Sequence, residues 1–245
     1  NDNCKYLIIM SIKRHIPNAI TCCNLFSGCI ACVMAFKGAF DLAMLFIVLG
    51  AVFDFFDGMV ARLLHVSSPL GVQMDSLADD VTFGLAPATI VFCYMHDALY
   101  YPHYLGVLAE ILPYAAFLIA VFSACRLAKF NVDKRQTNTF IGLPTPANAL
   151  FWSSLITGAG HWIFNLNAGW LLLLGLIILF SYFLVSEIPM FSLKLKNLIW
   201  ESNKIRYIFI IVSAPMLALG YLAPVFIITW YLLLSIILYI RTPKA

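Results

Sequence analysis

The chain has 245 residues, of which 62% are hydrophobic and only 11% are charged. Because a soluble domain of this size would have about a quarter of its residues charged, the composition excludes an ordinary soluble protein. The net charge is only +3, and we expect no nucleic-acid partner. Several apolar stretches reach roughly 20 residues, the length of a helix that crosses a bilayer. The expected fold class is therefore all-α, a polytopic helical membrane protein.

The N-terminal segment differs from the rest of the chain, because basic residues alternate there with apolar ones. Residues 5–16 predict an amphipathic helix that lies in the membrane interface, and Pro17-Asn18 is expected to turn the chain into the first span. The apolar stretches that follow predict about eight transmembrane helices, with a start signal for the third at Ser68-Pro69. Their approximate limits are residues 19–36, 41–64, 69–95, 107–129, 145–164, 168–187, 205–220 and 221–240.

Positive charge predicts how these helices are oriented. With eight spans, all but one of the 15 lysines and arginines fall on one side of the membrane, and only Lys37 falls on the other. Cytoplasmic loops of membrane proteins carry the excess of Lys and Arg. We therefore expect a multi-pass protein of the cytoplasmic (inner) cell membrane with both termini in the cytoplasm.

Four aspartates in the second and third predicted helices carry most of the chemical information. Asp54 and Asp57 are three residues apart, and Asp75 and Asp79 are four apart, so each pair lies on one helix face. The short connection makes the two helices antiparallel neighbours, and the two acidic faces can converge near the cytoplasm. Inserting one acidic residue into a bilayer costs about 2.5–3.5 kcal/mol, so converging carboxylates need cations between them. Oxygen ligands favour Mg²⁺, Mn²⁺ or Ca²⁺, and paired ions suit phosphoryl chemistry.

Small residues and an arginine accompany these carboxylates. Gly58, Ala61 and Gly71 share the acidic faces, and Arg62 lies at their edge. One interpretation is that a phosphate or nucleotide approaches the backbone there, and the other is that small residues only allow close helix packing. Arg62 is expected to bind phosphate, with an ion pair to Asp80 as the structural alternative.

Residues 54–79 read D-x-x-D-G-x-x-A-R-x8-G-x3-D-x3-D. This pattern resembles the motif of the CDP-alcohol phosphotransferase family, and every specified position is present. The resemblance extends to Pro17-Asn18 with Thr21 and Asn24 in the first span, and residues 126–131 and 140–148 are similar to the phosphatidylserine synthase branch. It covers roughly the first six spans. The expected organisation is an interfacial segment at 1–17, the family's membrane core at 18–190, and a cytoplasmic loop with a C-terminal helical pair at 191–245.

The resemblance implies a specific reaction, in which L-serine displaces CMP from CDP-diacylglycerol and phosphatidylserine forms. The implied enzyme is a CDP-diacylglycerol–serine O-phosphatidyltransferase that acts as a homodimer. Two divalent ions, Mg²⁺ or Mn²⁺, would bind the pyrophosphate on Asp54, Asp57, Asp75 and Asp79, with Asp79 also the general base. The residues expected to contact CDP-diacylglycerol are Gly58, Ala61, Arg62, Gly71, Thr21 and Asn24.

The acceptor half of the site is predicted from residues outside the motif. Arg126 and Lys129 end the fourth span, and they are either anchors with snorkelling side chains or ligands of the serine carboxylate or a lipid phosphate. The resemblance to the phosphatidylserine synthase branch favours binding. Thr145 and Asn148 begin the fifth span and are either helix-cap residues or polar contacts to serine.

Two other functions fit parts of this pattern. A related enzyme with a glycerol-phosphate or inositol-phosphate acceptor would use the same carboxylates, because these act on the shared CDP half. A divalent-cation transporter would also place acidic residues in its spans. However, transporters usually place such a site near the midplane, between two repeated halves, and no repeat is visible in the chain.

Overall fold

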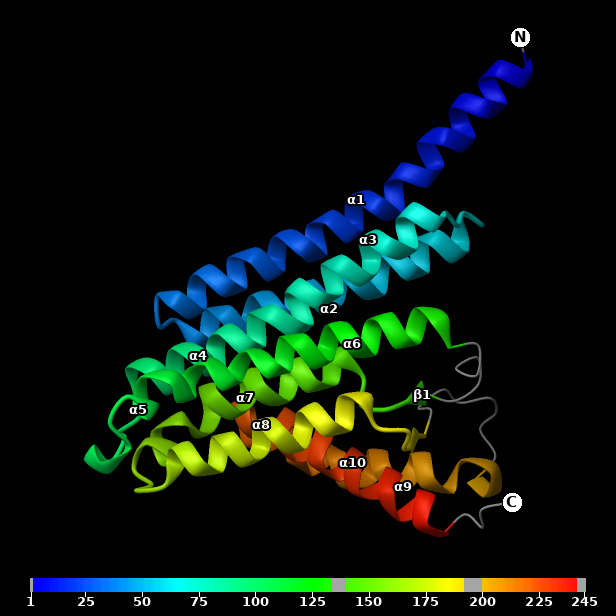
Figure 1. Ribbon diagram of the computed structural model, residues 1–245. Coiled ribbons are helices and arrows are strands. Elements are labelled where there is room, and N and C mark those ends of the chain that lie inside the picture. Colours follow the sequence, from blue (N-terminus) through cyan, green and yellow to red (C-terminus); the bar gives the residue numbers. More distant parts are fainter. Residues whose placement is uncertain (1, 134–139, 192–199, 242–245) are drawn as a thin grey trace.

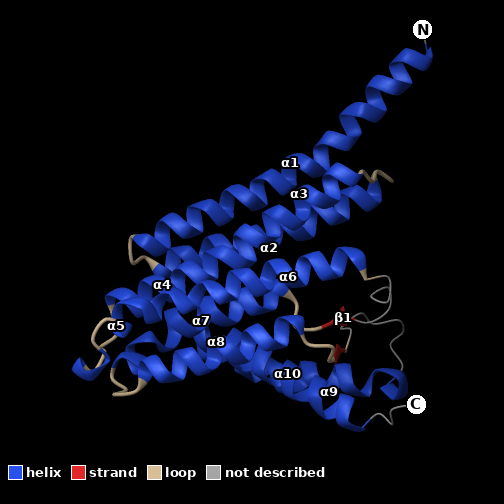
Figure 2. Cartoon of the chain, in the orientation of Figure 1, coloured by secondary structure: helices blue, strands red, loops and turns tan. Residues whose placement is uncertain are grey.

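The computed structural model describes residues 2–133, 140–191 and 200–241, without the side chains of residues 2–14, 140 and 202. Nearly all of this part of the chain is helical, which confirms the predicted all-α class. The helix axes are roughly aligned, and the helices form an elongated bundle (Figures 1 and 2). The centre of the bundle is filled by large apolar side chains, among them Ile47, Phe83, Ile90 and Trp152, all fully buried.

Each of the eight predicted spans coincides with helical segments. The first two are α1 (Asp2–Phe36) and α2 (Phe40–Leu63). The third comprises α3 (Pro69–Asp79), the π-helix η1 (Asp80–Leu85) and α4 (Ala86–Asp97). After the 3₁₀ turn η2 (His103–Leu105), the fourth comprises α5 (Leu108–Ile111), the 3₁₀-helix η3 (Leu112–Phe117) and α6 (Leu118–Val132). The others are α7 (Thr145–Phe164), α8 (Gly169–Val185), α9 (Trp200–Met216) and α10 (Ala223–Arg241), with the 3₁₀-helix η5 (Leu217–Leu222) between the last two.

Within the described residues, five stretches are long and apolar enough to cross a membrane. They are His15–Phe36, Phe40–Leu63, Pro69–Asp97, Leu108–Val132 and Asn203–Arg241. The last stretch contains both α9 and α10, which pack side by side because the chain reverses near Gly220, where φ is +59°. α8 is apolar but has only 17 residues. α7 is outside this set. It carries buried polar residues such as Ser153 and Ser154, which fits a helix enclosed by its neighbours.

The predicted start of the third span is confirmed, whereas its interior differs from a plain α-helix. The side chain of Ser68 accepts a hydrogen bond from the Gly71 N–H at 3.0 Å, and Pro69 occupies the first turn. Further along, Thr82 in η1 donates to the backbone carbonyl of Asn24 in α1 at 3.0 Å. A Cβ at Gly28 would collide with Thr82, so a glycine there lets α1 and η1 approach closely. π-Helical segments frequently occur at functional sites, and this one begins directly after Asp79.

The predicted turn at Pro17-Asn18 is wrong, because α1 continues through Pro17 as one helix of 35 residues. A proline inside a helix removes one hydrogen bond and normally kinks or ends the helix. Its fixed φ is nevertheless helical, and the residues that follow are held by packing between α1 and α2. The N-terminal part of α1 projects beyond the bundle (Figure 1). Whether residues 5–14 form an amphipathic surface depends on side chains outside the described set.

One end of the bundle collects the segments that matter for the site. The α2–α3 connection, the C-terminal end of α6, the start of α7 and the C-terminal end of α10 all lie at this end (Figure 1). There β1 (Phe140–Ile141) pairs antiparallel with β2 (Pro189–Met190). Gly142 follows β1 with φ of +77°, and the Leu143 N–H donates to the Phe183 carbonyl at 2.9 Å. These contacts fix the start of α7 against the end of α8.

Candidate functional site

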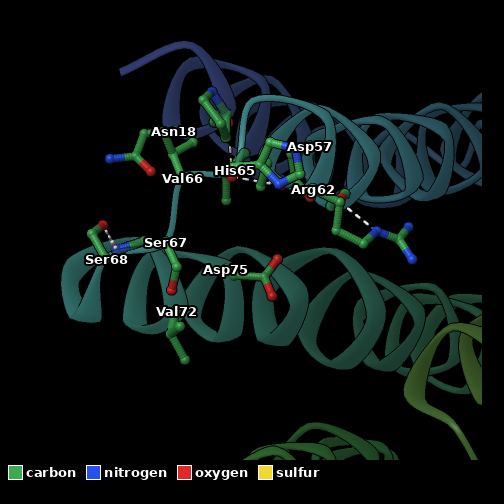
Figure 3. Close-up of a pocket in the computed structure, with 14 residues that line it drawn as sticks. Asn18, Asp57, Arg62, His65, Val66, Ser67, Ser68, Val72 and Asp75 are labelled. Atoms are coloured by element: carbon green, nitrogen blue, oxygen red, sulfur yellow. Dashed lines mark hydrogen bonds between the residues drawn. The ribbon is translucent and has the colours of Figure 1, made fainter. Parts of the chain in front are cut away.

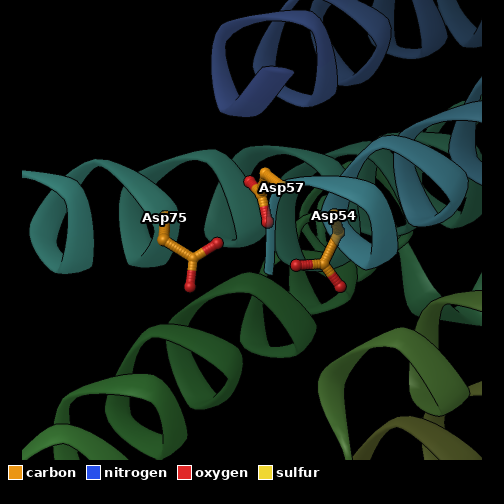
Figure 4. Close-up of side chains that lie close together, drawn as sticks. All are labelled: Asp54, Asp57 and Asp75. Atoms are coloured by element: carbon orange, nitrogen blue, oxygen red, sulfur yellow. The ribbon is translucent and has the colours of Figure 1, made fainter. Parts of the chain in front are cut away.

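Three of the four predicted metal-binding aspartates converge between α2 and α3. Carboxylate oxygens of Asp54, Asp57 and Asp75 all lie within 4.8 Å of one another. Figure 4 shows the two side chains from α2 and the one from α3 turned toward the same space. The three-residue spacing on α2 and the antiparallel pairing with α3 produce this convergence, as the sequence predicts.

The three carboxylates and their surroundings are suited to binding a divalent cation. Among the described residues, no ion pair joins any of the three carboxylates to a basic side chain, and Oδ1 of Asp75 is buried without a hydrogen-bond partner. A buried carboxylate oxygen without a partner is costly, and neighbouring carboxylates repel one another. Carboxylate oxygens are the ligands that Mg²⁺, Mn²⁺ and Ca²⁺ prefer. The cluster can therefore hold metal ions.

Two polar residues of α1 form hydrogen bonds with acidic side chains, one with a member of this cluster and one with Asp79. The hydroxyl of Thr21 lies 2.5 Å from Oδ2 of Asp57 and 3.1 Å from the Pro17 carbonyl. The side-chain amide of Asn24 donates to Oδ1 of Asp79 at 3.1 Å. Thr21 and Asn24 are three residues apart, so both lie on the α1 face that packs against the acidic helices.

Asp79, the predicted general base, lies next to the three-carboxylate cluster and is not part of it. Its carboxylate interacts electrostatically with Asp54 and Asp75 and is held by Asn24. A charge interaction also links Asp79 with Arg126 on α6. Asp79 therefore lies between the carboxylate cluster of α2 and α3 and the basic residue of α6.

A cavity of about 490 Å³ opens beside the cluster, a size typical of small-molecule sites. Its walls come from α1, α2, the α2–α3 connection and α3 (Figure 3). It is lined by Pro17, Asn18, Thr21, Asp57, Gly58, Ala61, Arg62, His65, Val66, Ser67, Ser68, Gly71, Val72 and Asp75. Five of the six residues predicted to contact CDP-diacylglycerol are among them. The exception is Asn24, which is fully buried and bonded to Asp79.

The small residues at the cavity differ in what surrounds them. A Cβ at Gly58 would meet nothing within 4 Å, so packing inside this chain does not require a glycine there. At Gly71, a Cβ would come within 3.0 Å of Asn18 Oδ1 and 3.1 Å of Ser68 Oγ, so close packing explains that glycine. Arg62 donates from Nε to the Gly58 carbonyl at 2.9 Å, and the ion pairs found among the described residues do not include one between Arg62 and Asp80. Space for a ligand is thus clearest at Gly58.

The predicted acceptor residues lie at the same end of the bundle, on α6 and α7. Arg126, Thr145 and Asn148 are buried, with exposed fractions of 7%, 1% and 0%. Within the part of the chain that the structure describes, Nε of Arg126, Oγ1 of Thr145 and both polar side-chain atoms of Asn148 have no hydrogen-bond partner. Neither helix-cap bonding nor snorkelling explains these side chains, because no side-chain cap bond is formed there among the described residues and Arg126 is buried. Lys129 differs, since it is partly exposed and forms an ion pair with Glu187 at 3.2 Å.

Sequence reasoning missed several residues that line the cavity. Asn18, His65, Ser67 and Ser68 were not among the predicted contacts, although Asn18 belongs to the motif of the first span. The connection between the two acidic helices has no fixed pattern, so its residues carried no chemical signal. Only the position of the connection, directly beside Gly58 and Gly71, could have indicated that it forms a wall of the site.

Comparisons with a family profile and with individual proteins point to the same enzyme family. The sequence profile of a family described as CDP-alcohol phosphatidyltransferase matches residues 14–185. The CDP-diacylglycerol–serine O-phosphatidyltransferase of Bacillus subtilis (strain 168) is 38% identical over 133 residues, which are 54% of this chain and 70% of the relative. The protein of the same description from Helicobacter pylori (strain J99) is 32% identical over 174 residues, 70% of each chain. A third, from Mycobacterium leprae, is 28% identical over 237 residues, 92% of this chain and 73% of the relative.

Proposed function

The chain belongs to the CDP-alcohol phosphatidyltransferase family, and from this premise we propose that it transfers the phosphatidyl group of CDP-diacylglycerol to L-serine. The products are phosphatidylserine and CMP. The observation that carries the proposal is the carboxylate cluster at the wall of a nucleotide-sized cavity. The activity named in the descriptions of the relatives supports serine as the acceptor.

The donor lipid binds with its nucleotide in the cavity between α1, α2 and α3. Its pyrophosphate lies at Asp54, Asp57, Asp75 and Asp79, and its cytidine lies along Gly58, Ala61, Arg62 and Gly71. Two divalent ions, Mg²⁺ or Mn²⁺, held by these four aspartates would supply the positive charge that stabilises the leaving phosphate. Thr21 holds the carboxylate of Asp57 in place by its hydrogen bond.

Asp79 accepts the proton in the transfer step. The hydroxyl oxygen of serine attacks the phosphorus that carries the diacylglycerol, and the bond from this phosphorus to the CMP oxygen breaks. The hydroxyl proton passes to Asp79, which Asn24 orients by donating to one of its oxygens. Asn24 therefore positions the base, and its buried location separates it from the cytidine.

Serine binds at the start of α7 and the end of α6. Arg126 supplies a positive charge for the serine carboxylate or a lipid phosphate, and Lys129 supplies a second charge at the edge of this region. Thr145 and Asn148 offer hydroxyl and amide groups that have no partner among the described residues. An amino acid with one carboxylate, one ammonium and one hydroxyl group can satisfy such a set.

The organisation and location of the enzyme follow the same proposal. The family match supports a membrane core at about residues 18–190, with residues 1–17 and 191–245 as additions. The apolar helices show a membrane protein. The one-sided distribution of the basic residues supports an orientation with both termini and the active site on the cytoplasmic side of the inner membrane. We expect the active form to be a homodimer.

A product assay tests the proposal. Purified protein in detergent is given CDP-diacylglycerol and Mn²⁺, with labelled L-serine in one reaction and labelled glycerol 3-phosphate in another. We expect label in lipid and release of CMP only with serine. Incorporation of glycerol 3-phosphate alone would reassign the acceptor within the family, and absence of CMP release with either acceptor would contradict the proposed chemistry.

A further inference from the structure

The α2–α3 connection contains a residue in an unusual backbone conformation beside the cavity. His65 has φ of +52°, and among the residues that the structure describes it is the non-glycine residue with positive φ. Its N–H donates to the Arg62 carbonyl at 3.2 Å, and the Val66 N–H donates to the Ala61 carbonyl at 3.0 Å. These two bonds form the Schellman motif that ends many helices. Glycine usually occupies the left-handed position because a Cβ strains it, so histidine carries a cost there.

His65 lines the cavity from beyond the end of the helix that carries Asp54 and Asp57. His65 and Asp57 both belong to the cavity wall, on the connection and on α2 respectively (Figure 3). Asp57 lies six residues before the end of α2 at Leu63, about 9 Å along the helix axis at 1.5 Å per residue, and His65 lies beyond that end. Metal ions held by the carboxylates would bind the phosphate groups of the donor on the Asp57 side. The part of the donor that can reach His65 is therefore the nucleoside.

We propose that His65 binds the nucleoside part of the donor lipid at the end of the cavity away from the carboxylates. This inference rests on the proposed function. A neutral imidazole presents one donor and one acceptor, which suits the hydroxyl groups of ribose and the polar edge of cytosine. Strained backbone positions persist where they serve a site, and ligand binding explains why histidine stands where glycine would relieve the strain.

Two variants separate this role from a structural one. His65→Gly and His65→Asn both suit a left-handed backbone, so neither should lower the melting temperature of the purified protein. Binding of CDP in the presence of Mn²⁺ is measured by calorimetry, with inorganic pyrophosphate as the second probe. We expect the Kd for CDP to rise about tenfold in both variants and the Kd for pyrophosphate to stay the same. His103→Asn, an exposed histidine of η2 at the other end of the bundle, is the control and should change neither value.

Three results would overturn the inference. Unchanged CDP affinity in both variants would show that the imidazole does not contact the nucleotide. An equal loss of CDP and pyrophosphate affinity would place the effect at the carboxylates, and a lower melting temperature in both variants would show a structural role. Failure of the proposed function is a separate outcome, since the unmodified protein would then itself fail to bind CDP and to form phosphatidylserine, and the inference would fall with it.

Discussion

The donor end of the site, between α1, α2 and α3, and the acceptor region on α6 and α7 hold their polar side chains in different ways. At the donor end, Thr21 and Asn24 bond to carboxylates, and an open cavity of about 490 Å³ lies alongside. In the acceptor region, Arg126, Thr145 and Asn148 are buried with polar atoms that have no partner in the described protein. Oδ1 of Asp75 at the donor end also has no partner among the described residues, but Asp57 and Asp79 are already held there by hydrogen bonds. We therefore infer that the donor end is partly organised before its ligand arrives, whereas the acceptor region is completed by its ligand.

This difference has an energetic meaning. Leaving a buried polar group without a partner costs about 1–3 kcal/mol, and the acceptor region carries several such groups. A ligand that satisfies them recovers this free energy, so small changes in the ligand should cause large losses in affinity. The donor end depends instead on charge and space. Substitutions in the two regions should therefore affect different substrates.

The largest effect is expected at the residue that lies between the two regions. Asp79→Asn removes the proposed base and one metal ligand, so turnover should fall about a thousandfold. Folding should be retained, because asparagine has nearly the same shape and still bonds to Asn24. Turnover is measured as CMP release and stability as melting temperature, with Asp97→Asn at the exposed end of α4 as control. Full activity of the Asp79 variant would show that the base is misassigned.

The acceptor region is tested by removing its buried charge. Arg126→Ala should raise the KM for serine about 10- to 100-fold, since hydrogen bonds to charged groups contribute about 1.5–3 kcal/mol. The KM for CDP-diacylglycerol should change little. The matched control is Arg241→Ala at the exposed end of α10. An equal rise in both KM values would mean that Arg126 supports the whole site and that the two regions are not separate.

The donor end is tested by filling its space. Gly58→Leu should raise the KM for CDP-diacylglycerol about tenfold, a loss of about 1.4 kcal/mol, because a side chain there enters the cavity. The melting temperature should not fall, since no atom of the described residues lies within 4 Å of a Cβ at this position. Gly175→Leu on α8 is the control, because Gly175 has equally open surroundings away from the cavity. A loss of stability in the Gly58 variant alone would favour the packing interpretation of this glycine.

The smallest effect concerns the hydrogen bond that orients a donor carboxylate. Thr21→Val removes the hydroxyl that contacts Asp57, and one neutral donor is worth about 1 kcal/mol, or about fivefold in activity. The loss should appear as a higher Mn²⁺ concentration for half-maximal activity. Thr229→Val on α10 removes a hydroxyl that bonds only within its own helix, and it should have no effect. An unchanged metal dependence at Thr21 would remove this residue from the site.

The sequence predicted the donor end better than the acceptor region, for a physical reason. Asp54, Asp57 and Asp75 lie within 22 positions, and helical periodicity with one short turn is enough to bring them together. The burial of Arg126 and Asn148 depends on packing between helices distant in sequence, which periodicity does not report. For the same reason, the sequence did not predict the π-helix after Asp79 or the continuation of α1 through Pro17. Both features follow from contacts with neighbouring helices rather than from local preference.

The most direct test of two separate regions compares one variant from each in a single binding assay. CDP binding is measured by calorimetry on metal-stripped protein, before and after Mn²⁺ is added, for the unmodified protein, Asp75→Asn and Arg126→Ala. We predict that Mn²⁺ strengthens CDP binding in the unmodified protein and in Arg126→Ala, and that Asp75→Asn loses most of this gain. Metal-dependent CDP binding that survives in Asp75→Asn, or disappears in Arg126→Ala, would contradict the assignment of the donor site to the carboxylates of α2 and α3.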